Sequence, residues 1–293
     1  MHFSNCYDKI ILFIQSFTIG EIINLEIRNR KIKLTFSRVL AGVLVLLLVD
    51  AVLKYSSGLG KNNSAEKIIT EFASQNGFTL DDYPAEIQKM LVQNEETKEF
   101  VINYPKKITH FQPEKLDFSE YKDCTQPPHL MQWDMRWGYM NYSGNVFGLT
   151  GSAPTCLSMA AIYVMHDVNM TPVHIAGFSR GTAFETEPEK LLSNGARAMG
   201  MNVAEVSRNN QRLREAVTEK GCAVICMLKS QDLSQFVLIT GISEDGNFII
   251  QDPSSKKLSQ KGYSYVDLQN RGIKRIWKYS LPSQSTDGQT PAT

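Results

Sequence analysis

The chain has 293 residues, enough for one or two domains with a full hydrophobic core. Its 31 basic and 30 acidic residues give a net charge of +1, which argues against a nucleic-acid-binding protein because such proteins need a strong basic excess. The 5 cysteines form no Cys-x-x-Cys pair and have no histidines placed to complete a tetrahedral site, so neither a structural zinc ion nor any cofactor is expected.

The N-terminal residues carry the signals of a membrane anchor. A basic stretch, Arg28–Arg38, precedes the aliphatic run Val39–Val49, and residues 34–53 supply the roughly 20 residues that a helix needs to cross a bilayer. The basic flank would stay cytoplasmic, so a single-pass signal-anchor in residues 1–55 would leave everything after Lys54 outside the cell. The alternatives are a cleaved signal peptide, which the lack of an A-x-A site disfavours, and a buried helix of a soluble protein.

A linker and a helical arm are predicted next. Residues 56–64 are small, polar and glycine-bearing, which is typical of a linker. Apolar residues at helical spacing predict short helices over residues 65–74, 83–92 and 96–103. Pro105 is expected to end the third helix, and residues 106–126 to form an extended connector. Residues 65–126 are therefore a small arm in front of the main domain.

The main domain is expected over residues 127–282, followed by a polar tail, residues 283–293. In its first half, apolar residues at helical spacing predict helices over residues 154–165, 187–199 and 210–219. Its second half predicts strands over residues 223–228, 236–241, 248–251, 263–265 and 273–279. The Asp-Gly turn between the second and third of these strands indicates a hairpin. Helices followed by antiparallel strands predict an α+β fold.

Ser152 is the first candidate site residue. It follows a glycine turn in L-T-G-S-A-P-T-C-L-S-M, Leu149–Met159, and stands at the start of the most apolar helix. The first amides of a helix are unpaired and carry the positive end of its dipole, which suits a nucleophile that bears negative charge. The plain alternative is a serine that caps the helix.

Gln235 and Asp252 are a second candidate pair. Gln235 lies nine residues before Glu244 in the hairpin turn and Asp252 eight residues after it, so the hairpin places the two side chains roughly opposite each other. A general base and the carboxylate that orients it would occupy such a pair.

Three stretches together resemble the bacterial papain-like cysteine peptidases of the bacteriocin-processing, double-glycine leader type (family 39). They are M-Q-W-D-M-R-W-G-Y (Met131–Tyr139), the helix start at Leu149–Met159, and S-Q-F-V-L-I-T-G with F-I-I-Q-D-P (Ser234–Pro253). The family has Gln-x-Asp-x-x-Trp, Gly-Cys-Gly-Pro-Thr, His-Phe in a strand, and Asp-Pro after the next. The resemblance implies a papain-like fold, a helical lobe plus an antiparallel sheet. The arm also resembles segments that precede this domain in exported bacterial proteins.

The resemblance implies roles for four residues. Gln132 matches the glutamine that helps to build the oxyanion hole, and Asp252 matches the residue that orients the histidine. Ser152 stands where the nucleophilic cysteine belongs, and Gln235 where the histidine base belongs. A serine hydroxyl needs an adjacent base, and a glutamine amide accepts no proton at useful pH, so the two positions that carry out the chemistry are degenerate.

Each candidate also has a plain interpretation. Gln132 would be a surface residue beside tryptophans, Gln235 a polar residue on a strand edge, and Asp252 a turn opener. Cys156, one helical turn after Ser152, could be a displaced nucleophile, but its apolar neighbours indicate core.

The sequence thus predicts a membrane-tethered pseudopeptidase on the extracellular side of the cell membrane. It would hold an extended peptide or protein ligand in the old cleft without cutting it, and would not be an enzyme. Two alternatives stay open: a hydrolase that uses Ser152 or Cys156 with an unrecognised base, and a structural or partner-binding membrane protein.

Overall fold

The computed structural model describes residues 43–44, 47–48, 51, 60–229 and 234–282, within two compact units, Met1–Lys61 and Asn62–Thr293. In the first unit the described residues are mostly helical, and Val43, Leu44, Leu47 and Leu48 are exposed. No helix among the described residues combines the length and hydrophobicity that crossing a bilayer requires. Most of the predicted span, residues 34–53, lies outside the described residues, as does the predicted tail, residues 283–293.

The second unit opens with the helical arm. Its first helix covers residues 60–76, so residues 60–64, expected in a linker, are already helical. The buried side chains of Ala65, Ile69 and Ala73 fix this helix against the core. Once the helix is formed there, extending it toward its N-terminus through residues 60–64 adds one hydrogen bond for each residue that is ordered. A 3₁₀ turn, η2 (Leu80–Asp82), leads into α3 (Ala85–Gln93), which buries the predicted stripe of Ile87, Met90 and Leu91.

The third predicted helix, over residues 96–103, consists of a 3₁₀ turn followed by a short α-helix. Asn94 accepts a hydrogen bond from the amide of Glu96 and starts the 3₁₀ turn η3 (Glu95–Thr97), which continues as α4 (Lys98–Ile102). The third predicted helix does end before Pro105, because α4 stops at Ile102. The expected extended connector, however, begins with a further helix, α5 (Tyr104–Ile108), and Pro105 lies in its first turn, where its missing N–H would have no partner in any case. The connector that follows is irregular except for η4 (Ser119–Tyr121).

The arm and the main domain share one core. Phe100 of α4 stacks on Tyr139 with 4.3 Å between ring centroids, and the Tyr139 hydroxyl donates to the carbonyl of Phe100 at 2.8 Å. The Phe100 ring also covers Gly148, where an added Cβ would lie 2.5 Å from the ring. The arm is therefore part of the same folded body as residues 127–282.

The helical layer of the main domain surrounds α7 (Ser152–Met165), which confirms the predicted apolar helix and extends it by two residues. A small hairpin, β1 (Asn141–Tyr142) and β2 (Asn145–Val146), leads through α6 (Phe147–Thr150) into α7. The sequence did not predict α8 (Pro172–Ser179) or α9 (Ala183–Thr186). The predicted helix over residues 187–199 is α10 (Pro188–Lys190), a π-helical turn η5 (Leu191–Gly195) and α11 (Ala196–Ala198).

The sheet has six antiparallel strands in the order β3-β8-β4-β5-β6-β7. They are β3 (Asn202–Glu205), β4 (Ala223–Lys229), β5 (Ser234–Ile242), β6 (Phe248–Gln251), β7 (Gly262–Tyr263) and β8 (Ile273–Ser280). The predicted hairpin is confirmed: Ser243 and Gly246 close the β5–β6 turn, with Gly246 at φ +76°. The sequence missed β3, which is short and mostly exposed.

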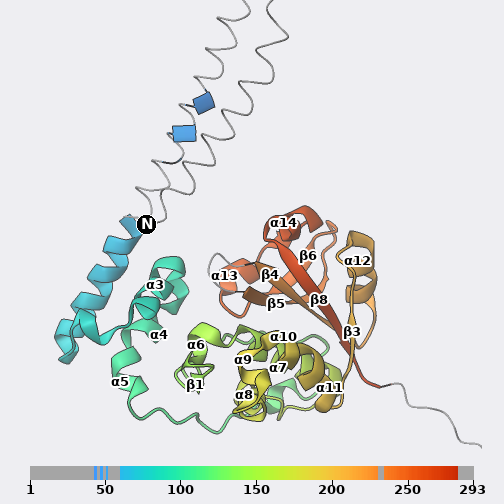
Figure 1. Cartoon of the computed structure of the whole chain (residues 1–293), viewed down its shortest axis with the longest axis horizontal. Coiled ribbons are helices and arrows are strands. Elements are labelled where there is room, and N and C mark those ends of the chain that lie inside the picture. Colours follow the sequence, from blue (N-terminus) through green and yellow to red (C-terminus); the bar gives the residue numbers. More distant parts are fainter. Residues whose placement is uncertain (1–42, 45–46, 49–50, 52–59, 230–233, 283–293) are drawn as a thin grey trace, which may run out of the picture. The chain divides into compact units, whose positions relative to one another are not determined.

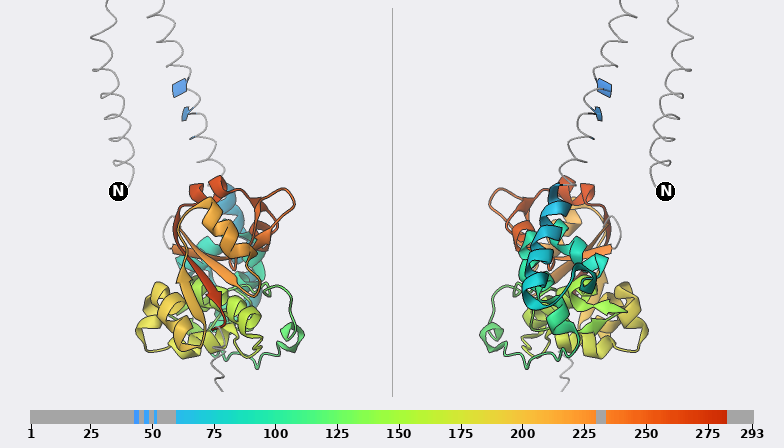
Figure 2. Two further views of the ribbon diagram at one scale, coloured as in Figure 1. Left: turned by 90° about the vertical axis from the view of Figure 1, so that its right-hand side faces the viewer. Right: turned by 90° about the vertical axis from the view of Figure 1, so that its left-hand side faces the viewer.

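Helices cover both faces of the sheet (Figures 1 and 2). Phe236 and Leu238 of β5 point into the core beneath α7, whereas Val237 and Ile239 point to the opposite face. That opposite face is covered by α12 (Asn210–Thr218) and α14 (Tyr265–Asn270), and α13 (Lys256–Ser259) lies beside β6. Helices around an antiparallel sheet confirm the predicted α+β class.

The shared core gives a first test. Because the Cβ of an alanine at position 148 would lie 2.5 Å from Phe100, Gly148→Ala should lower the free energy of unfolding by about 1–3 kcal/mol through overpacking. The measurement is a urea titration followed by tryptophan fluorescence. Gly177→Ala in α8, where no atom lies within 4 Å, is the matched control and should raise it by about 0.5–1 kcal/mol. Equal effects of both substitutions would contradict this packing.

Candidate functional site

Ser152 is the first residue of α7, and Gly151 takes the cap position in front of it. Gly151 is tightly enclosed, since an added Cβ would lie 2.4 Å from the Phe147 ring and 2.6 Å from its carbonyl oxygen. The side chain of Ser152 is half-buried and makes no hydrogen bond to any described residue. The serine therefore does not cap the helix, since Gly151 holds that position.

Gln132 connects the three motifs. Its backbone amide donates to the carbonyl of Pro253 at 2.9 Å, just beyond the third motif's Asp252. Its side-chain Nε2 donates to the carbonyl of Gly148 at 2.8 Å, in α6 just before Ser152. The side chain is buried, and its Oε1 has no partner among the described residues. Its donor group is thus committed to a backbone carbonyl, which weakens it as an oxyanion-hole donor.

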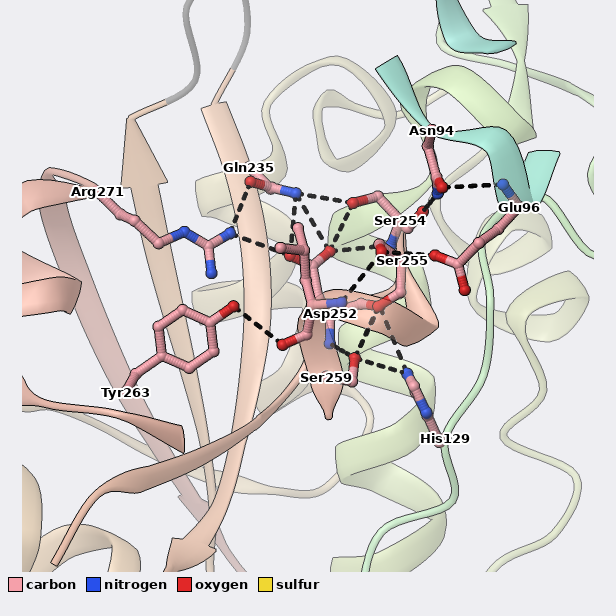
Figure 3. A network of polar contacts seen from close by, with 11 residues as sticks. Asn94, Glu96, His129, Gln235, Asp252, Ser254, Ser255, Ser259, Tyr263 and Arg271 are labelled. Carbon is pink, nitrogen blue, oxygen red and sulfur yellow. Dashed lines mark hydrogen bonds and ion pairs between the residues drawn. The ribbon is translucent and has the colours of Figure 1, made fainter. Parts of the chain in front are cut away.

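Gln235 and Asp252 are direct neighbours, as the hairpin predicts. The Gln235 Nε2 donates to both carboxylate oxygens of Asp252, at 3.2 and 3.3 Å, and to the hydroxyl of Ser254 at 2.9 Å (Figure 3). Ser254 in turn donates its hydroxyl to Asp252 at 2.6 Å and its backbone amide at 3.0 Å. Asp252 has no exposed surface, so these hydrogen bonds replace the water that it loses on folding.

Arg271 supplies the charge that neutralises Asp252, and the sequence reasoning did not find it. Its Nη2 lies 3.0 Å from the Asp252 carboxylate and 3.1 Å from the Gln235 Oε1 (Figure 3). Arg271 follows α14 and lies 19 residues beyond Asp252, in no motif that marks it. The role of Ser254 could have been predicted from the sequence, because the carboxylate of an Asp that opens a turn commonly accepts a hydrogen bond from the backbone amide two residues later.

The four predicted positions are only partly brought together. Strand alternation places Gln235 on the same face of β5 as Val237 and Ile239, whereas α7 packs against the other face. No hydrogen bond joins Ser152 to Gln132, Gln235 or Asp252 within the part of the chain that the structure describes.

Cys156 belongs to the core. Its thiol has no exposed surface, and burial, followed by the nearby charge of Asp252 and the neighbouring Cys226, raises its pKa well above the ordinary value. A thiol with a raised pKa carries almost no thiolate at neutral pH. The structure therefore favours the predicted core role of Cys156 over a displaced nucleophile.

His129 is the histidine closest to this network, and it was also missed. Its Nε2 lies 3.1 Å from the hydroxyl of Ser259 and 3.4 Å from the main-chain oxygen of Asp252, so it approaches the backbone rather than the carboxylate. Burial lowers its pKa, and the Asp252 carbonyl and charge oppose that effect. No hydrogen bond among the described residues links His129 to Ser152, so it is not placed as that serine's base.

The helical arm holds the turn that carries Asp252 and Ser254. Asn94 Nδ2 and the indole Nε1 of Trp133 both donate to the carbonyl of Ser254, at 2.7 and 2.9 Å (Asn94 is drawn in Figure 3). One residue along, the Ser255 hydroxyl donates to the Glu96 carboxylate at 2.6 Å, which also accepts from the backbone amide of Lys257 at 3.2 Å. Cap residues of the arm therefore position the turn of the candidate site.

The arrangement provides no route to proton transfer at position 235. The amide of Gln235 has no site that binds a proton near neutral pH, and its Oε1 already accepts from Arg271. An unassisted serine hydroxyl is not a nucleophile. No family model, curated protein or solved structure is significantly similar to this chain, so the function has to be argued from this geometry.

The ion pair gives a second test. Arg271→Met removes the guanidinium and leaves the fully buried Asp252 carboxylate unpaired, which should lower the free energy of unfolding by about 3–5 kcal/mol. Urea titration measures the loss. The control is Arg212→Met, whose exposed pair with Glu215 should contribute almost nothing. Similar, small effects of both substitutions would show that Arg271 does not carry the charge balance.

The Glu96 contacts give a pH test. Burial of the carboxyl raises its pKa, but hydrogen bonds from Ser255 and the Lys257 amide, with the charge of Lys256, outweigh it, so the pKa lies below the ordinary 4.5. A depressed folded-state pKa adds stability that is present above pH 4.5 and is lost as the pH falls through the folded-state pKa. Wild-type protein should therefore lose more stability than Glu96→Gln when urea titrations at pH 6 and pH 3.5 are compared. An equal loss in both proteins would contradict the contact.

Proposed function

We propose that the chain is a membrane-tethered, catalytically inactive relative of papain-like peptidases that binds an extended peptide or protein segment near Ser152. The observation that carries the inactivity is the state of Gln235, whose amide donates to Asp252 and Ser254 and accepts from Arg271. With both ends of the amide engaged inside the protein, no group at this position can activate the serine.

Accessibility supports a binding role. The side chains of Ser152 and Gln235 are only half-buried, and the residues Leu149 and Thr150 just before α7 are also partly exposed. The Ser152 hydroxyl has no partner among the described residues, so it can bond to a peptide backbone. Buried, fully packed side chains at these positions would instead have favoured a purely structural role.

Two further points support the proposed class and location. An apolar helix that starts at Ser152 and packs against an antiparallel sheet is compatible with the papain-like order of motifs. Tethering to the membrane is supported by the exposed aliphatic side chains of Val43, Leu44, Leu47 and Leu48, and the extracellular side of the second unit by the basic stretch Arg28–Arg38. These four residues lie inside the predicted span.

The binding role is tested with the full chain in detergent. Fluorescently labelled peptides, including glycine-rich ones, should bind saturably by anisotropy, and Ser152→Trp should weaken that binding at least tenfold because an indole replaces the hydroxyl at the start of α7. Ser207→Trp, at an exposed serine of the loop before α12, should leave binding unchanged. No saturable binding to any peptide would sink the binding role.

Catalytic inactivity has its own readout. A fluorophosphonate and an electrophilic thiol probe should label neither Ser152 nor Cys156 at pH 7, as read by peptide mass spectrometry. Peptide-sensitive labelling of either residue would instead support the alternative of an active hydrolase.

A further inference from the structure

We propose that Arg271 is the positioning residue of the degenerate base site: its guanidinium takes the place of a protonated histidine as the positive partner of Asp252, and thereby fixes an amide at position 235. The inference rests on the proposed function only in treating position 235 as a former base position. The contacts that carry it are those of the Gln235–Asp252–Arg271 cluster (Figure 3).

The cluster determines which way the amide points. Arg271 Nη2 has two hydrogens, one directed at Asp252 and the other at the Gln235 Oε1. The Gln235 Nε2 directs its hydrogens at the carboxylate and at the Ser254 hydroxyl. A side chain at position 235 must therefore accept from a cation and donate to an anion at once, which an amide does without any change of charge.

A histidine at this position would be held as a neutral ring. One nitrogen would donate to Asp252, and the lone pair of the other would be taken by Arg271, the same lone pair that a general base needs. A protonated imidazole at position 235 would lie next to the Arg271 guanidinium, which already pairs with Asp252. This neighbouring positive charge lowers the pKa of the imidazole. Inactivity then depends on Arg271 as well as on the two substituted motif positions.

The position of Arg271 is itself well determined. It caps the C-terminal end of α14, and its guanidinium lies over the Tyr263 ring at 5.3 Å from the centroid. Only 22% of the side chain is exposed. Gly272, at φ +75°, turns the chain directly into β8, so the backbone holds Arg271 at the end of the sheet where Asp252 lies.

The titratable groups that surround position 235 come from several elements. The turn after β6 contributes Asp252, the end of α14 contributes Arg271, and β7 contributes Tyr263 behind the guanidinium. Cys156 of α7 lies near the Asp252 charge, and His129 contacts the Asp252 backbone. Among these groups Arg271 is the cation in contact with the side chain at position 235.

The experiment measures the pKa of the imidazole introduced by Gln235→His in the full chain, from the pH dependence of deuterium exchange at its C2 carbon, read by peptide mass spectrometry. With Arg271 present, the pKa should lie below the ordinary value of about 6.5. Adding Arg271→Met should raise it by at least about one pH unit, because Asp252 then pairs with the imidazolium alone. Adding Arg271→Lys should keep it low.

Arg275→Met in the Gln235→His background is the matched control, since Arg275 pairs with Glu189 and Glu205 and should leave the imidazole pKa unchanged. The same imidazole pKa in the Gln235→His variant and in the variant that also carries Arg271→Met overturns the proposal. Should Arg271→Met prevent folding, the single Gln235→His variant still decides: a pKa above 6.5 overturns the proposal and a pKa below it supports it. Peptide binding by the wild-type chain is measured separately, so failure of the binding role and failure of this inference are distinguishable.

Discussion

A carboxylate with no access to water is the constraint on which the candidate site depends. Asp252 is fully buried, and a buried charge is tolerated only if it is paired and hydrogen-bonded. In a working triad, part of that compensation comes from a histidine that is charged during the reaction. Here a permanent cation, Arg271, provides it, together with the Gln235 amide and Ser254. The carboxylate is therefore balanced without any residue that can gain or lose a proton near neutral pH.

This balance is the structural basis of the proposed inactivity. Ser152 would need a neighbouring base to act as a nucleophile, but the amide of Gln235 is hydrogen-bonded at both its nitrogen and its oxygen. The histidine that does lie near, His129, contacts the backbone of Asp252 and Ser259 rather than the serine. The described residues form a framework that joins the three motifs through Gln132. Such a framework suits binding better than chemistry.

The helical arm belongs to this framework. Asn94 and Glu96 bond to the turn that follows Asp252, and Phe100 packs against Tyr139 and Gly148 at the other end of the same contact region. Both contacts come from short helical segments of the arm. Asn94 has two roles there, since its side chain caps η3 and also donates to the carbonyl of Ser254. The arm is thereby connected to the candidate site through a few directional hydrogen bonds, which explains why it folds with the main domain.

The sequence by itself determined the class of the fold, the apolar helix that starts near Ser152, the β5–β6 hairpin and the pairing of Gln235 with Asp252, because each depends on local periodicity or on a turn of fixed length. It misjudged residues 106–108, which belong to the helix α5 and not to an extended connector, and residues 60–64, because tertiary packing overrides local preference. Only the tertiary structure placed Arg271, Glu96 and His129 around Asp252, since they come from segments that no periodic pattern relates to it. Long-range packing also decided which face of β5 lies beneath α7, with Phe236 and Leu238 on that face and Val237 and Ile239 on the other, because the partner of each face comes from elements far away in the chain.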